Sequence, residues 1–187
     1  MAQLVHLAAL PEYSGEVGNL KEDPQFLKVL KSSQKLVKKI LNDIPQVHES
    51  LALPNYQSND LLLMVATLEI PMVPILTSLS ADFTLEMSLI RILEGLQIFK
   101  DLLSIIRHHT TPPEKLDILL ADINDLLSQI YKMFELVQLD SSVRYTGSGL
   151  ASRLVGDFQK RVAAHIILTN MQDFAESMHR SLRFMRS

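Results

Sequence analysis

The stretch that decides the fold is FQKRVAAHIILTNMQDFAESMHRSLRFMR, residues 158–186. Its apolar side chains recur at steps of four and three residues, the repeat that places them on one face of a helix. The stripe consists of Ala163, Ile167, Met171, Phe174, Met178, Leu182 and Met185. At 3.6 residues a turn it runs for roughly eight turns, far longer than an ordinary surface helix. We therefore expect this helix to pack along its whole length in a helical core.

The face opposite this stripe has a different character. Its predicted members are Phe158, Arg161, Val162, His165, Arg180 and Arg183. An outward aromatic residue and clustered arginines on one helix are typical of a protein-binding surface. The helix predicted at 158–186, which we call the organising helix, therefore favours a protein as the partner.

Composition restricts the class of protein. The chain has 187 residues, 47% of them hydrophobic and 21% charged, which suits a single globular domain. A net charge of −3 argues against a nucleic-acid surface as the main binding site. The absence of cysteine excludes thiol catalysis, thiolate metal sites and disulfides, and by itself favours a reducing compartment.

The N-terminal residues mark a domain boundary, and the most apolar region of the chain argues against membrane insertion. Residues 1–22 lack a basic start and a long apolar centre, so we interpret them as a loose leader preceding one domain at 23–187. The most apolar region, 61–79, contains Glu69, Pro71 and Pro74. A charge and two prolines in that region do not suit a membrane span.

The first long helix is predicted to begin at Pro24, with Asp23 as its N-cap. Its core face is predicted to comprise Phe26, Leu30, Ser33, Val37, Ile40 and Ile44. Its outer residues are Lys28, Lys31, Lys35 and Lys39, with Lys38 on the flank. Pro45 is expected to kink this helix or to end its regular part.

A long connection follows, with a short helix in SNDLLLM, 58–64, capped near Ser58 or Asn59. The second long helix has the repeating positions Leu85, Leu89, Ile92, Leu96, Phe99, Leu103 and Ile106. Such a repeat is typical of bundle-core positions. No stretch alternates as a strand does, so the predicted class is all-α.

Thr111-Pro112-Pro113-Glu114 resembles a capping box that opens the third helix. The residues predicted to be buried there are Leu116, Leu119, Ile123, Leu126, Ile130, Met133 and Val137. Those predicted outward or on the flanks are Asp117, Asp122, Asp125 and Glu135. LDSSVRYTGSG, 139–149, is predicted to be a loop. A long first connection, a short second and a medium third fit an up-up-down-down four-helix bundle.

Three stretches resemble the long-chain helical cytokines of the interleukin-6 and granulocyte colony-stimulating factor branch. LEIPMVPILTSLSADFTLEMSLIRILEGL (68–96) is similar to the end of the first long loop and the start of the second helix. KLDILLADINDLLSQIYKMFEL (115–136) resembles the third helix, and residues 158–185 resemble the fourth. The resemblance covers most of the chain from Pro24 to Met185. It implies a secreted cytokine, monomeric when free, that binds the ectodomains of class I cytokine receptors.

One departure from this family concerns the disulfides that usually hold the first long loop. The second pair falls at Ser78 and Ser88, and the first pair has no cysteine near Ala52 or Ser58. The loop is therefore expected to be held without covalent help.

The resemblance implies three receptor-facing surfaces. The first, on the first and third helices, would contain Lys35, Lys38, Lys39, Asp43, Asp122 and Asp125. The second would contain Phe158, with Arg161 beside it, and Asp60 from the first loop. The third would contain Arg180 and Arg183. Each has a simpler alternative: solvated helix faces for the first, packing of Phe158 beneath the loop for the second, and the helix dipole for the third.

Other classes of function have less support. His108 and His109 are adjacent, so their side chains diverge on a helix and do not suggest a zinc site. TGSGLAS, 146–152, offers neither a phosphate-binding glycine pattern nor a nucleophile elbow. We therefore expect no enzyme activity and no cofactor. An intracellular helical interaction module stays open, because it would explain the absence of cysteine, and a lipid-carrying bundle would explain the apolar content.

Overall fold

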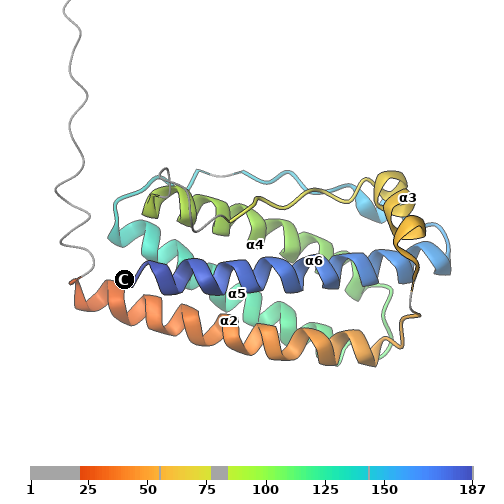
Figure 1. Cartoon of the computed structure of the whole chain (residues 1–187), viewed down its shortest axis with the longest axis horizontal. Helices are drawn as coiled ribbons and strands as arrows, with labels where there is room; N and C mark the ends of the chain where they lie inside the picture. Colours follow the sequence, from red (N-terminus) through yellow and green to blue (C-terminus); the bar gives the residue numbers. More distant parts are fainter. Residues whose placement is uncertain (1–21, 55, 77–83, 143, 187) are drawn as a thin grey trace, which may run out of the picture.

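The computed structural model describes residues 22–54, 56–76, 84–142 and 144–186 (Figure 1). Its helices are α2 (Pro24–Ser50), α3 (Ser58–Leu68), α4 (Leu85–Arg107), α5 (Glu114–Leu136), the 3-10 helix η2 (Leu150–Arg153) and α6 (Asp157–Phe184). Strands are absent from these described ranges, which confirms the all-α class for them. The predicted leader, apart from Glu22, lies outside them.

Helix α2 begins where the sequence predicts and ends later. The Asp23 carboxylate accepts hydrogen bonds from the backbone N–H groups of Gln25 at 2.7 Å and Phe26 at 3.0 Å. Pro45 does not end the helix, which continues to Ser50. Pro45 lies on the exposed side, where water can satisfy the carbonyl that loses its helical partner, while Val47 beyond it is buried. Burial of Val47 thus holds the residues after Pro45 in the helix.

Two predicted helix starts need correction. The α3 helix begins at Ser58 itself, and its N-cap is Gln57, whose side chain makes no capping bond. The Thr111 capping box does not form, because α5 begins at Glu114 with Pro113 as its N-cap. Thr111 therefore lies too far ahead of the first turn to satisfy its free N–H groups.

The four long helices share one core. α2 packs against α5 and α6, α4 packs against the same two helices, and α3 lies on α6 (Figure 1). Every member of the predicted α6 stripe is buried, from Ala163 to Met185. At Gly95 the α4 backbone comes so close to α6 that an added Cβ would stand 2.2 Å from the Phe174 ring. A side chain there would have to displace the Phe174 ring from the core.

Burial is broader than one stripe per helix. Val162, predicted to lie outward beside Phe158, is only 1% exposed, and Ala164, Ile166 and Leu168 are also buried. The reason is that α6 packs against α2 and α4 and is also covered by α3. Conversely, Leu85 and Val137 at the predicted stripe ends are only partly buried.

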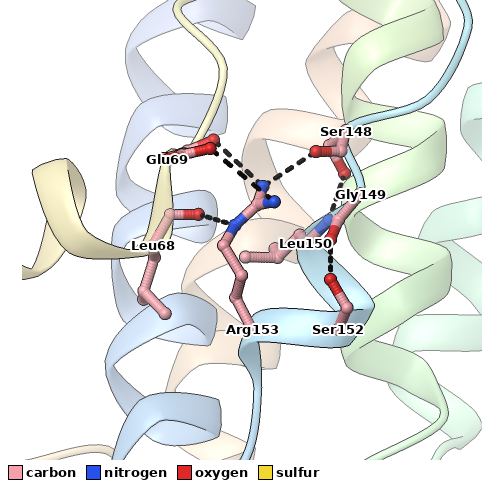
Figure 2. A network of polar contacts seen from close by, with 7 residues as sticks. All are labelled: Leu68, Glu69, Ser148, Gly149, Leu150, Ser152 and Arg153. Carbon is pink, nitrogen blue, oxygen red and sulfur yellow. Dashed lines mark hydrogen bonds and ion pairs between the residues drawn. The ribbon is translucent and has the colours of Figure 1, made fainter.

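An arginine network ties the first connection to the last one (Figure 2). Arg153 in η2 donates through Nε to the Leu68 carbonyl at 2.6 Å and through Nη2 to the Ser148 carbonyl at 2.8 Å. Its Nη1 lies 3.8 Å from a carboxylate oxygen of Glu69. Residues 139–149 are irregular where described, as predicted, but η2 after them was not predicted. Arg153 thus holds the C-terminal end of α3 in place by non-covalent contacts.

Candidate protein-binding surfaces

Seven of the eleven site residues predicted from the sequence fall into three groups in the structure, together with four neighbours; Lys35, Asp60, Asp125 and Arg161 lie outside these groups. We call the three groups the charged cluster (Lys39, Asp43 and Asp122), the basic group (Lys38, His179, Arg180 and Arg183) and the aromatic cluster (His48, Tyr56, Phe158 and His165). The grouping differs from the one expected from sequence.

The charged cluster joins α2 to α5. Lys39 Nζ hydrogen-bonds to the Asp122 carboxylate and lies 3.6 Å from a carboxylate oxygen of Asp43. The hydrogen bond with Asp122 is the main cause that raises the pKa of Lys39. The Asp122 side chain is 10% exposed and that of Lys39 is 50% exposed. Asp122 is therefore a buried partner of Lys39, and the expectation that it points outward or to the flank is wrong.

Asp122 is buried because α5 packs closely against α2, and Lys39 from α2 supplies the compensating charge that makes burial of a carboxylate tolerable. Lys35 and Asp125 remain exposed on the same two helices. Of the expected first surface, Lys35, Asp125 and the exposed part of the Lys39 side chain are therefore available to a partner.

Lys38 belongs with α6 instead. The pKa of His179 is lowered chiefly by burial, and then by the positive charges of Lys38, Arg183 and Arg180. Successive residues of a helix point about 100° apart, so Lys39 can face α5 while Lys38 faces α6. Arg180 also donates to Ser177 Oγ at 3.0 Å and lies 4.0 Å from Glu176. The basic group thus concentrates positive charge across α2 and the last turns of α6.

The aromatic cluster lies at the other end of α6. Phe158 is 54% exposed, and the Tyr56 ring meets it edge-on with 6.2 Å between ring centroids. Tyr56 also meets the His165 ring edge-on at 5.3 Å. His165 Nδ1 is 2.9 Å from His48 Nε2, which is hydrogen-bonding distance. The first connection therefore supports Phe158 from one side without covering it.

Arg161 and the two histidines contribute charge near this cluster. Arg161 is exposed, and its charge opposes the rise that burial causes in the pKa of Tyr56. Burial, followed by the charge of His48, lowers the pKa of His165. Asp60 is exposed in the first turn of α3. The structure thus places Phe158 and Arg161 near Tyr56, with Asp60 on the helix that follows it.

Sequence reasoning missed Tyr56 and His48 as members of this group. His48 and His165 are 117 residues apart in the chain, and no local pattern links them. An aromatic residue two positions after Pro54 in the first connection is the only local signal that pointed to Tyr56.

The clefts and titratable groups of the described residues show little that suggests chemistry. A cleft of about 830 Å³ lies between α4, α5 and residues 144–146, and most of the residues that line it are polar. Tyr145 on its wall donates to Asp101 at 3.1 Å, and burial raises the pKa of this tyrosine to about 12. Within the described ranges no three His, Asp or Glu side chains are grouped so that they could hold a metal ion.

Among the described residues, every helix is too short or too polar to span a membrane. No protein-family model and no curated protein matches the chain.

Proposed function

We propose that this protein is a secreted long-chain helical cytokine that binds class I cytokine receptors through separate surfaces and brings their ectodomains together. The observation that carries the proposal is Phe158, a large aromatic side chain left 54% exposed at the start of the organising helix. Rigid aromatic residues held against a neighbour are the usual anchors of protein interfaces. The role is that of a ligand for receptors, without catalysis or cofactor.

The proposal includes the up-up-down-down arrangement. Three contacts agree with the two antiparallel helix pairs that this arrangement requires: Gln34 Nε2 donates to the Leu182 carbonyl at 2.9 Å, His48 pairs with His165, and Arg107 Nε donates to Asp117 at 2.7 Å. The first contact joins the first half of α2 to the last turn of α6, and the second joins the end of α2 to the first half of α6. The third joins the end of α4 to the beginning of α5. These pairs favour α2 and α6, and also α4 and α5, running in opposite directions.

Separation of the surfaces supports assembly of more than one receptor chain. Phe158 and Arg180 are 22 positions apart on one helix, or about 33 Å at a rise of 1.5 Å per residue. A separation of this size exceeds the radius of a small domain. One receptor chain could therefore bind near the basic group or the charged cluster while another binds the aromatic cluster.

The decisive experiment measures binding of the purified chain to a panel of class I cytokine receptor ectodomains. We expect saturable binding to at least one of them, and a ternary complex when a second ectodomain is added. The complex is detected by analytical ultracentrifugation. Absence of binding to every ectodomain in the panel would overturn the proposal.

A further inference from the structure

A continuous chain of contacts links two histidines to the exposed Phe158. His48 on α2 hydrogen-bonds to His165 on α6. The ring of Tyr56, from the first connection, makes edge-on contacts with the rings of both His165 and Phe158. His165 and Phe158 are seven residues apart on α6, so they share one helix face. Tyr56 spans the space between them. The position of Tyr56 therefore depends on the histidine pair on one side and determines the support of Phe158 on the other.

The hydrogen bond between the two imidazoles survives one protonation but not two. When both rings are neutral, one nitrogen donates and the other accepts. When one ring is protonated, it still donates to its neutral partner. When both are protonated, each facing nitrogen carries a proton, so neither can accept, and two positive charges face each other at 2.9 Å. The second protonation step therefore separates the rings.

The charged groups around the pair offer no buried counterion for that second step. Arg161 and Lys160 on α6 and His109 after α4 line a neighbouring cleft of about 180 Å³ that also includes Ala164, adjacent to His165. On α2 the carboxylate next in sequence is Glu49, which is exposed. The first connection contributes Tyr56. Asp157, 3.9 Å from Lys160, and Asp60 on α3 are exposed as well, so the doubly charged pair lacks a buried counterion among the groups named.

We infer that the His48–His165 pair positions Tyr56 and Phe158 as a binding surface, and that protonation of both imidazoles releases this surface. Binding through Phe158 is then strong at neutral pH and weak in acid, while binding through the charged cluster changes less. The consequence for binding rests on the proposed function, whereas the link from the histidines to Phe158 is a property of the free protein.

The first test therefore needs no receptor. NMR spectra of the full chain, recorded from about pH 7.5 to about pH 4.5, follow the ring signals of His48, His165, Tyr56 and Phe158. We expect the Tyr56 and Phe158 signals to move with the second macroscopic step of the histidine pair. Ring signals of Phe158 that stay constant while both histidines titrate would overturn the inference.

Variants separate positioning from simple stability. His48→Gln keeps a side chain that can both donate and accept but cannot take up a proton. It should preserve the neutral-pH signals of Phe158 and abolish their acid shift. The matched control is His179→Gln, which alters a histidine in the basic group and should leave the acid shift unchanged. An acid shift that persists in His48→Gln would also overturn the inference.

The second test uses whichever ectodomain binds in the panel and depends on Phe158. We expect the Kd of the wild-type chain to rise about tenfold between about pH 7.5 and about pH 5, the change that one pKa unit of linkage produces. For His48→Gln the change should stay within about twofold. Absence of any binding at neutral pH counts against the proposed function, and the NMR result then decides the histidine coupling independently.

Discussion

At the scale of single residues, substitution of Phe158 distinguishes a receptor-binding residue from a packing residue. Its ring is 54% exposed, so Phe158→Ala removes less buried surface than a core substitution would. We expect a loss of about 1 kcal/mol of unfolding free energy, against about 3–5 kcal/mol for a buried phenylalanine. Binding to the receptor chain at this surface should lose about 2 kcal/mol. Thermal unfolding and surface plasmon resonance measure the two effects.

The control for this prediction is Ile118→Ala on α5, because Ile118 is 52% exposed and lies outside the three groups. It should change neither receptor binding nor stability by more than about 0.5 kcal/mol. If Phe158→Ala instead lowers stability strongly while the folded protein binds normally, the residue is packing and not an anchor.

Asp122 tests whether the charged cluster serves structure or recognition. Asp122→Asn leaves Lys39 without its main partner, but Lys39 is half exposed and can regain water. We therefore expect a loss of about 1 kcal/mol in denaturant unfolding, smaller than for a fully buried pair. Asp125→Asn, on the exposed side of the same helix, should cost less than about 0.5 kcal/mol. Equal costs for the two would contradict the assignment of Asp122 as a buried partner.

The histidines predict how stability depends on pH. The pKa values of His165 and His179 are lowered in the folded state, by burial first in both cases. Below the unfolded value of about 6.5 the unfolded chain therefore binds more protons. This contribution to stability is complete above about pH 6.5 and is lost as pH falls toward the folded pKa values. The melting temperature should fall on acidification, and less steeply in His179→Gln.

At the scale of elements, the Arg153 network takes the place of a covalent link for the first connection. In Arg153→Ala the bonds to the carbonyls of Leu68 and Ser148 are lost together. Since the long helices keep their own core, we expect faster amide hydrogen exchange in α3 and little change in α4 and α5. Mass spectrometry of exchanged peptides measures this difference.

Arg153→Lys is the matched variant, because it keeps the charge but loses the planar fork that reaches both carbonyls. It should show intermediate exchange in α3. Unchanged exchange of α3 in both variants would mean that packing on α6 holds this helix without the arginine.

At the scale of the whole molecule, the division of charge between α2 and its neighbours affects association. Lys38 on α2 belongs to the basic group, together with residues of α6. Lys38→Glu should therefore slow association with a receptor chain that binds the basic group about tenfold at low salt, and less at high salt. Dissociation should change little. Lys28→Glu, an exposed substitution elsewhere on α2, is the control. Stopped-flow measurements at two salt concentrations would expose an unaffected association rate, which argues against this surface.

Local patterns were sufficient for much of the fold. The N-cap at Asp23, the stripe from Ala163 to Met185 and the repeat in α4 follow from side-chain chemistry within a few turns, and the structure agrees with them. Pro45 and Thr111 show the limit of the same reasoning. At Pro45 the burial of Val47 outweighs a local break, and at Thr111 a helix start shifted to Glu114 removes the expected cap.

What the sequence determined by itself is therefore the set of long helices and the faces that carry most of their apolar residues, because both depend on neighbours three or four positions away. Which outer residues stay exposed was decided only by tertiary structure. Val162 is buried because α6 is covered on more than one side, and Asp122 because α5 meets Lys39. The pairing of His48 with His165, like the support of Phe158 by Tyr56, joins residues about one hundred positions apart, where no local periodicity operates.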